Sequence, residues 1–200
     1  MGEATDTKTR RWALILGASS GIGEATARAA AEAGYDICGV YLGRSRGEKL
    51  DAAIAAVKST GVKALYIRGN AADDEKRREV VAQLGERFAA ARARGEEPQL
   101  GIVVHSLAFG SLQPFLPDGD VPTITRKQMD MTSDVMAHSL VYWTQYLYAA
   151  GLIGSTTRIF ATSSEGASKA VPMYGAVAAA KAAVEAHCRQ PSIELARDRK

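Results

Sequence analysis

The sequence has few cysteines, few aromatic residues and no long apolar run. Of its 200 residues, two are cysteine (Cys38 and Cys188) and 6% are aromatic. Two cysteines are too few for a disulfide scaffold, and the chain has no CxxC pair for zinc. No stretch reaches the roughly 18 uncharged apolar residues of a membrane helix, and the first ten residues lack the apolar core of a signal peptide. We therefore expect no metal site, no membrane association and a cytoplasmic, reducing location.

The charge is balanced rather than concentrated. The formal net charge is +3, from 25 Lys and Arg against 22 Asp and Glu, and the two signs are interspersed. Nothing here is typical of a nucleic-acid-binding surface, so we expect no nucleic-acid partner. With 46% apolar residues, the chain is long enough for one globular domain. We expect a flexible leader at 1–10 and a single catalytic domain at 11–200.

Short apolar segments alternate with amphipathic or alanine-rich segments along the chain. Strands are predicted at 12–16, 36–42, 62–67, 100–104 and 158–162, and helices at 24–33, 48–59, 73–93, 127–150 and 173–189. This alternation predicts an α/β fold, a doubly wound parallel sheet of the Rossmann type with right-handed crossovers. Because such folds usually continue with further strands, we expect a version that lacks the C-terminal strands.

A glycine-rich loop lies between the first predicted strand and the first predicted helix. It reads Gly17-Ala18-Ser19-Ser20-Gly21-Ile22-Gly23. Glycines let the backbone approach a pyrophosphate closely, and the helix N-terminus offers free N–H groups and a positive dipole end. The hydroxyls of Ser19 and Ser20 can add donors. A glycine-rich turn without a ligand is the simpler alternative, but the strand–loop–helix context favours dinucleotide binding.

The end of the second predicted strand indicates which dinucleotide is preferred. It carries no acidic residue to hold the 2′-hydroxyl of NAD, whereas Arg44 and Arg46 could clamp a 2′-phosphate. We therefore expect NADP(H) to be preferred, with NAD(H) possible. The simpler alternative is that both arginines are solvated loop residues without a ligand. After the third strand, Asn70 and Ala71 are placed to receive the adenine edge.

Tyr174 and Lys181 lie seven residues apart on the last predicted helix. Two helical turns are about 7.2 residues, so both side chains should project from one face. A nearby lysine favours the phenolate, which would make Tyr174 a usable proton donor and oxyanion stabiliser. Ser163 and Ser164, after the fifth strand, could add a hydroxyl to this catalytic site. Spacing alone favours the simpler interpretation of a surface tyrosine and a surface lysine.

Together these motifs resemble the short-chain dehydrogenase/reductases, over about residues 11–200. The details depart from the ketoreductase pattern of that family, in which the lysine follows the tyrosine by four residues. In this chain that position is Ala178. His105-Ser106-Leu107-Ala108-Phe109-Gly110 replaces the usual Asn-Asn-Ala-Gly, and Met136 replaces the catalytic asparagine. These departures are similar to the enoyl-acyl-carrier-protein reductase branch, although the glycine loop is of the ketoreductase type. Ser164 stands where many members of that branch have a second tyrosine.

The resemblance implies a role for each matched residue. The pyrophosphate is held by Gly17, Ser20, Gly21, Ile22 and Gly23. Arg44 meets the adenosine ribose or its phosphate, and Asn70 and Ala71 flank the adenine. The nicotinamide side is lined by Ser106, Leu107 and Ala108, and Gly110 lies near the substrate thioester. Lys181 bonds the nicotinamide ribose, and Tyr174 faces the substrate carbonyl.

The function implied is NAD(P)H-dependent reduction of the 2,3 double bond of a trans-2-enoyl thioester, carried by acyl-carrier protein or coenzyme A, in a homotetramer or dimer. Two alternatives stay open: a ketoreductase or alcohol dehydrogenase acting on a 3-oxo thioester, and a cofactor-binding protein without catalysis. His105 is interpreted as a hydrogen-bonded structural histidine. Pro191 is expected to kink the last helix or to end it early.

Overall fold

The computed structural model describes residues 9–43 and 47–197, which gather into two compact units. Within these ranges, unit 1 takes in the residues up to Val104 and Tyr146–Arg158, and unit 2 takes in His105–Gln145 and the residues from Ile159 on. None of the helices described is both long and apolar enough to cross a membrane. Within the described ranges, no three His, Cys, Asp or Glu side chains gather as a metal-ligand set.

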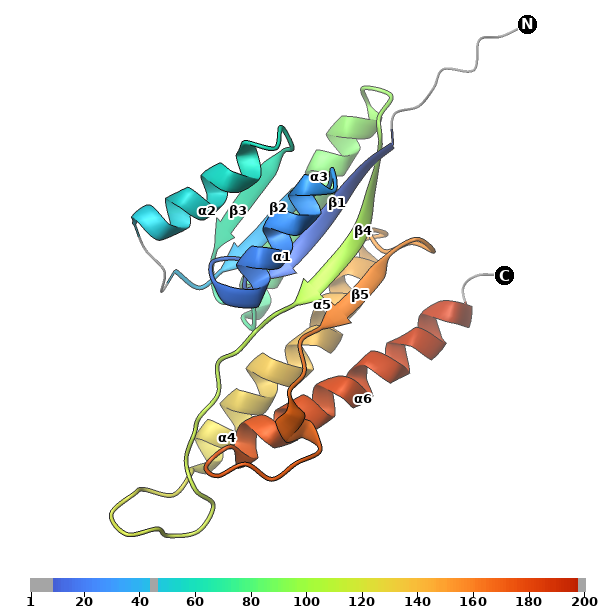
Figure 1. The fold of residues 1–200 in the computed structure, drawn as a ribbon. Coiled ribbons are helices and arrows are strands. Elements are labelled where there is room, and N and C mark those ends of the chain that lie inside the picture. The colour runs from blue at the N-terminus through green and yellow to red at the C-terminus, as the bar shows by residue number, and fades with distance from the viewer. Residues whose placement is uncertain (1–8, 44–46, 198–200) are drawn as a thin grey trace, which may run out of the picture. The chain divides into compact units, whose positions relative to one another are not determined.

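Five parallel strands form one sheet in the order β3-β2-β1-β4-β5. They are β1 (Thr9–Leu16), β2 (Asp36–Tyr41), β3 (Ala64–Arg68), β4 (Glu97–His105) and β5 (Arg158–Ala161) (Figure 1). The chain adds strands outward from β1 to β3 and then returns to place β4 on the other side of β1. The strand order therefore reverses beside the carboxyl end of β1, which is where open α/β sheets bind ligands. The predicted Rossmann-type sheet is confirmed.

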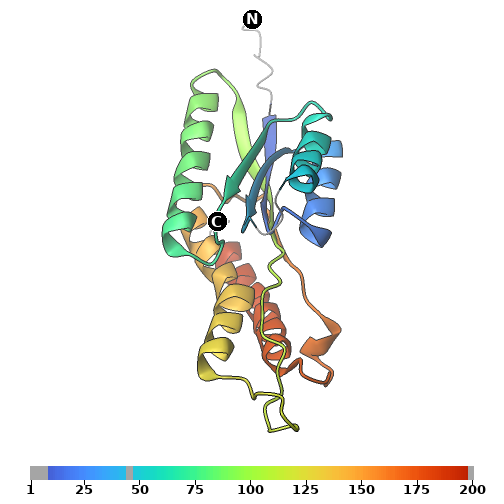
Figure 2. The same cartoon turned by 90° about the vertical axis from the view of Figure 1, so that its left-hand side faces the viewer.

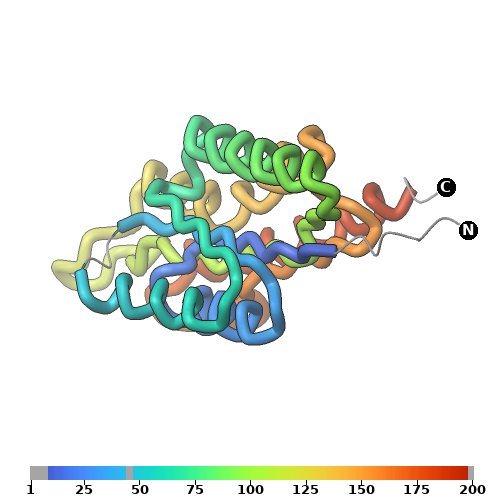
Figure 3. Tube along the Cα trace, turned by 90° about the horizontal axis from the view of Figure 1, so that it is seen from above, coloured from blue at the N-terminus to red at the C-terminus, as the bar shows by residue number. Residues whose placement is uncertain are grey.

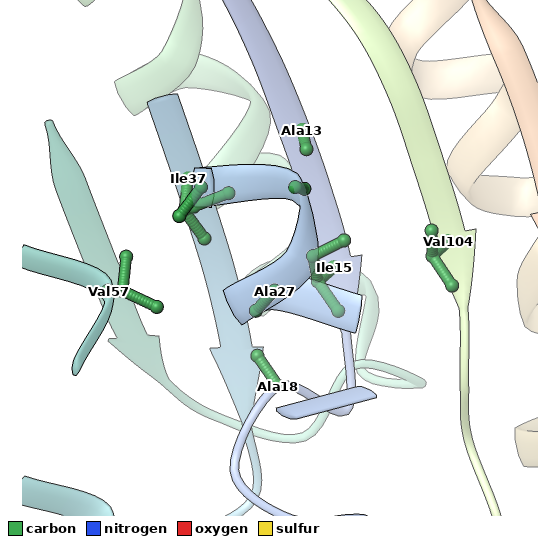
Figure 4. Packing of buried hydrophobic residues seen from close by; sticks show 9 residues of the cluster. Ala13, Ile15, Ala18, Ala27, Ile37, Val57 and Val104 are labelled. Carbon is green, nitrogen blue, oxygen red and sulfur yellow. The ribbon is translucent and has the colours of Figure 1, made fainter. Parts of the chain in front are cut away.

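Helices cover both faces of the sheet in unit 1. Helices α1 (Gly21–Glu32) and α2 (Glu48–Lys58) lie on one face, and α3 (Asp74–Arg92) lies on the other (Figures 2 and 3). The core beneath α1 is built largely from small residues, which let the helix approach the strands closely (Figure 4). Its buried members are Ala13, Ile15, Ala18, Ala27, Ala30, Ala31, Ile37, Val57 and Val104.

The first strand begins at Thr9, before the domain boundary expected at residue 11. Arg10 forms two hydrogen bonds of 2.9 Å from its guanidinium to the carboxylate of Asp36. That carboxylate is 2% exposed and also accepts from the N–H of Lys63. Because a buried carboxylate needs such partners, the ion pair fixes residues 9 and 10 in the sheet. The expected leader was therefore too long at its C-terminal end; residues 1–8 lie outside the described part.

The helix predicted at 127–150 contains an irregular turn. It consists of α4 (Arg126–Ser133), a π-helical turn η1 (Asp134–His138) and α5 (Ser139–Ala149). The hydroxyl of Ser139 donates to the carbonyl of Val135 at 2.8 Å, a side-chain bond that competes with the regular backbone ladder. Turns of this kind occur often at functional sites. In unit 2, η1 and α4 pack against α6 (Gly175–Arg197).

Of the two expectations for Pro191, a kink in the last helix or an early end of it, the early end is wrong. Helix α6 continues through Pro191 to Arg197 (Figure 1). Side-chain bonds span the turns around the proline: Ser192 donates to the carbonyl of Arg189, and Gln190 donates to Glu194. These bonds offset part of the cost of the missing proline N–H.

Candidate functional site

The glycine loop follows β1 and is closed against β2. The N–H groups of Gly17 and Ala18 both donate to the carbonyl of Val40, at 2.9 and 3.0 Å. Gly17 has φ 92° and Gly21 has φ 56°, a region that L side chains seldom adopt. The predicted glycines are thus required by the turn itself, whether or not a ligand is bound.

Gly23 is required for a different reason, which is close packing. A Cβ built on Gly23 would lie 2.1 Å from the carbonyl oxygen of Gly17, so only glycine allows the first turn of α1 to rest on the loop. Gly39 of β2 is equally constrained, because its Cβ would lie 2.8 Å from the Cβ of Ala18 and 2.7 Å from the ring of Tyr66. The sequence prediction did not include Gly39.

The start of α1 has donors to offer to an anion. The first intrahelical bond is the one from Glu24 N–H to the carbonyl of Ser20, at 3.3 Å. The N–H groups of Gly21, Ile22 and Gly23 precede it, and Ser20 at the N-cap makes no side-chain capping bond. Ser20 and Ile22 are exposed, and Ser19 is half-buried. This combination of a cradle without Cβ atoms, free N–H groups and a positive helix end fits a dinucleotide pyrophosphate.

The residues predicted near the adenosine are only partly described. Arg44 and Arg46 lie outside the described residues. Asn70 is exposed at a turn after β3, where its side-chain oxygen accepts from Ala72 N–H at 3.0 Å and its carbonyl accepts from Asp73 N–H. Ala71 beside it is buried. The amide oxygen of Asn70 is therefore engaged in the turn, and its NH₂ group is the part suited to a base edge.

Tyr174 immediately precedes α6, which begins at Gly175. Its carbonyl accepts the N–H of Ala178 at 2.8 Å, so it stands in register with the helix, two turns before Lys181. The phenol donates to the hydroxyl of Ser164 at 3.2 Å. The phenol ring lies on Gly166, whose Cβ would come within 2.6 Å of ring carbons. Gly166 therefore positions the ring, a role that the sequence prediction missed.

The two predicted serines have different partners. The Ser164 hydroxyl oxygen accepts both from the phenol and from the N–H of Gly166, at 3.2 Å each. Its own proton is not used in either bond and can be donated to a substrate oxygen. Ser163, by contrast, is exposed and donates its hydroxyl proton to Glu185. Only Ser164 is brought to the phenol.

Lys181 is 4% exposed and extends its ammonium group to the carbonyl of Thr162, at 2.6 Å. Burial lowers the pKa of Lys181 below its ordinary value. Thr162 is itself fixed, because its N–H donates to the carbonyl of His105 at 3.0 Å. An ammonium has three donors, and only one of them is used by this carbonyl. The others suit the vicinal hydroxyls of a ribose.

His105, at the end of β4, is buried and hydrogen-bonded, in agreement with its predicted structural role. Its Nε2 lies 2.7 Å from the Ser139 hydroxyl. Because Ser139 gives its proton to Val135, the imidazole must be the donor in this contact, which assigns the neutral Nε2–H tautomer. Burial, followed by the positive charge of Lys181, lowers the pKa of His105 to about 4.

The segment after β4 contains the residues predicted along the nicotinamide and the thioester. Ser106 and Leu107 are half-buried, and Ala108 is exposed. Gly110 is tightly packed: its Cβ would lie 2.7 Å from side-chain carbons of Thr132 and Val177 and 3.0 Å from the sulfur of Met136. Met136, which replaces the asparagine of the ketoreductase pattern, is 2% exposed and acts here as a packing residue.

The turn before Tyr174 is strained. Tyr174 N–H donates to the carbonyl of Val171 at 3.2 Å, Pro172 follows Val171, and Met173 has φ 60°. This is a type II turn with methionine where glycine or asparagine is preferred. The sequence Val-Pro-Met-Tyr could have signalled the turn through its proline, but no residue type in it predicts the left-handed methionine.

Comparison with known proteins agrees with these features. A family model described as Enoyl-(Acyl carrier protein) reductase matches residues 17–199. The 3-oxoacyl-[acyl-carrier-protein] reductase FabG of Staphylococcus aureus is 40% identical over 82 residues, which are 39% of this chain and 32% of that protein. The matched segment thus spans about a third of the length of this curated relative.

Two solved structures illustrate the fold. A short chain dehydrogenase of Burkholderia cenocepacia in complex with NADP is 26% identical, with a TM-score of 0.71 over 94% of this chain and 69% of that one. An enoyl-(acyl-carrier-protein) reductase of Anaplasma phagocytophilum in complex with NAD is 22% identical, with a TM-score of 0.71 over 94% of this chain and 66% of that one. Both similarities extend over units 1 and 2.

Proposed function

This chain belongs to the short-chain dehydrogenase/reductase family, and we propose that it reduces the 2,3 double bond of a trans-2-enoyl thioester with a nicotinamide dinucleotide. The observation that carries the proposal is the hydroxyl pair of Tyr174 and Ser164, 3.2 Å apart, at the start of a helix that carries Lys181 two turns later. Two neighbouring hydroxyl groups can each turn a proton toward an oxygen on which negative charge develops.

We assign the cofactor contacts as the family resemblance implies. The pyrophosphate contacts fall to Gly17, Ser19, Ser20, Gly21, Ile22 and Gly23, the adenine contacts to Asn70 and Ala71, the adenosine ribose contact to Arg44, and the nicotinamide contacts to Ser106, Leu107, Ala108 and Lys181. When bound, the nicotinamide supplies a hydride to the β-carbon of the substrate. NADP(H) is the preferred form, since Tyr41, Leu42 and Gly43 offer no acid for a 2′-hydroxyl.

The chain's own residues act on the thioester carbonyl. Tyr174 turns its single phenolic proton from Ser164 to the oxygen as the enolate charge forms, an interaction that is stronger in the transition state than in the ground state. Ser164 is left with one proton to donate to the same oxygen. Lys181 orients the ribose with its remaining ammonium protons. A C=C acceptor lies two carbons beyond the carbonyl, which accounts for a phenol set farther along the helix from the lysine than in ketone reductases.

A ketoreductase acting on 3-oxoacyl thioesters is the second candidate, favoured by the 40% identical segment shared with FabG. The two are separated by following NADPH oxidation with crotonyl and with acetoacetyl thioesters of coenzyme A or acyl-carrier protein. The enoyl assignment requires faster turnover of crotonyl thioester, and faster turnover of acetoacetyl thioester would replace it with the ketoreductase assignment.

Replacing Tyr174 with phenylalanine tests the catalytic role directly. Tyr174→Phe should lower kcat by about 10²- to 10⁴-fold, the usual contribution of a positioned proton donor, with the dinucleotide Kd unchanged within about 2-fold. Tyr148→Phe, at a 51% exposed tyrosine of α5, is the matched control and should keep full turnover. An active Tyr174→Phe enzyme would remove this residue from the mechanism.

A further inference from the structure

Arg68 is a basic residue at the carboxyl end of β3 that the function described so far does not use. It pairs with Tyr41, the last residue of β2, and the pairing is continued by a bond of 2.8 Å from Gly69 N–H to the carbonyl of Tyr41. The ends of β2 and β3 are therefore level. Arg68 starts from the end of β3, and its side chain is exposed.

The Arg68 side chain lies across Gly43, which closely follows β2. A Cβ built on Gly43 would lie 2.5 Å from the Nε of Arg68, 3.2 Å from its Cδ and 3.3 Å from its Cγ. Gly43 also has φ 85°, a conformation that disfavours any L side chain. The absence of a side chain at Gly43 is thus what allows the guanidinium of Arg68 to reach over the end of β2.

The guanidinium has no ionic partner in the part of the chain that the structure describes. Acidic side chains pair with Arg10, Arg28, Arg77, Arg78, Arg94 and Arg126, but none pairs with Arg68. Its five N–H donors are arranged as a planar fork that matches two oxygens of a phosphate. An unpaired fork held at a glycine is therefore suited to a phosphate monoester.

We propose that Arg68 binds the 2′-phosphate of NADP(H) and makes this chain prefer the phosphorylated dinucleotide. In folds of this type, the end of the second strand is where the ribose 2′ position is recognised. The inference rests on the dinucleotide binding proposed above, and it assigns to β3 a contact for which the sequence alone offered Arg44 and Arg46.

The test measures binding of 2′,5′-ADP and of 5′-AMP by calorimetry, which needs no turnover. The unaltered chain should bind 2′,5′-ADP at least about 10-fold more tightly than 5′-AMP. Arg68→Gln should weaken 2′,5′-ADP binding by roughly 10- to 150-fold, the range expected for hydrogen bonds to a charged group, and leave 5′-AMP within about 2-fold. Arg87→Gln, at an exposed arginine of α3, is the matched control and should change neither.

Gly43→Ala tests the geometry without removing the charge. The new methyl group would occupy the space of the Arg68 side chain, so 2′,5′-ADP binding should fall as in Arg68→Gln although Arg68 is still present. Melting followed by circular dichroism reports whether this variant folds. If it does not, Arg68→Lys decides instead, because a lysine keeps the charge without the fork and should recover only part of the preference.

Each failure has a distinct signature. If the unaltered chain binds neither nucleotide, the proposed dinucleotide function fails and the Arg68 assignment fails with it. If it binds both equally, the dinucleotide function stands and the Arg68 assignment is overturned. Arg44→Gln provides the remaining comparison. If Arg44→Gln loses the preference for 2′,5′-ADP over 5′-AMP and Arg68→Gln retains it, Arg44 binds the 2′-phosphate and the inference is overturned.

Discussion

Gly166→Ala should impair the proposed reductase activity while leaving nucleotide binding intact. Gly166 lies in the short helical turn η2 (Glu165–Ala167), two residues after Ser164. Its φ is not in the left-handed region, so alanine brings no backbone strain of its own. Among the described residues, the atoms nearest to the added methyl group are the Cδ1 and Cε1 carbons of Tyr174, both at 2.6 Å, followed by the Oγ of Ser164 at 3.6 Å. The substitution should therefore displace the Tyr174 ring.

The size of the effect follows from these distances. Carbon atoms in contact normally lie about 3.5–4.0 Å apart, so the ring must move by roughly 1 Å. The phenol is already 3.2 Å from the Ser164 hydroxyl, and a shift of this size breaks that bond. A misplacement of about 1 Å can cost about 10²-fold in rate, and overpacking typically costs 1–3 kcal/mol of stability. We expect both losses.

The assay is steady-state reduction of crotonyl thioester, with urea unfolding and dinucleotide titration on the same preparations. Gly166→Ala should show kcat lowered about 10²-fold, a dinucleotide Kd within about 2-fold and stability lowered by about 1–3 kcal/mol. Gly154→Ala is the control, because its Cβ meets nothing within 4 Å and its φ is also not left-handed. Full activity in Gly166→Ala would refute the argument that this glycine positions the phenol.

Two further predictions concern stability. The pKa of His105 is lowered to about 4 in the folded chain, below the ordinary value of about 6.5, so the unfolded state binds more protons at pH values between the two. The free energy of unfolding should therefore fall as the pH drops through this window, by about 2 kcal/mol at pH 5 relative to neutral pH. The difference in unfolding free energy between the wild-type chain and His105→Phe should narrow by that amount, and a difference that stays constant with pH would contradict the prediction. Met173→Gly should stabilise the chain by about 1 kcal/mol. At φ 60° the Cβ of methionine is penalised, and this penalty exceeds the entropy that glycine loses on folding. A lower melting temperature of the variant would contradict the strain assigned to this turn.

The sheet and the glycine loop were predictable because their signals are local. Alternating apolar and helical segments define a parallel sheet, and Gly17, Gly21 and Gly23 announce a tight turn between a strand and a helix. Gly17 and Gly21 are required by their own positive φ, and Gly23 by the carbonyl of Gly17 six positions earlier. The register between Tyr174 and Lys181 is also local, because it depends only on helical geometry.

The features that sequence reasoning missed depend on contacts between distant residues. Thr9 and Arg10 join β1 because Asp36, 26 residues later, is buried and needs a partner. Gly39 and Gly166 are glycines because Tyr66 and Tyr174 occupy the space a Cβ would take. From one sequence alone, glycines that are required by such packing cannot be distinguished from glycines in surface loops.

The hydrogen bonds around Tyr174 also decide how Ser164 can contribute. A serine that accepts from Gly166 and from the phenol has both lone pairs engaged. The phenol has one proton, so Tyr174 gives up its bond to Ser164 when it donates to the enolate oxygen. Ser164 then keeps its bond from Gly166 and donates its own proton to the same oxygen. Ser163 donates its proton to Glu185 and has no hydrogen bond with Tyr174 among those described. Of the two adjacent serines, Ser164 is thus the one whose hydrogen bonds are compatible with stabilising an enolate oxygen.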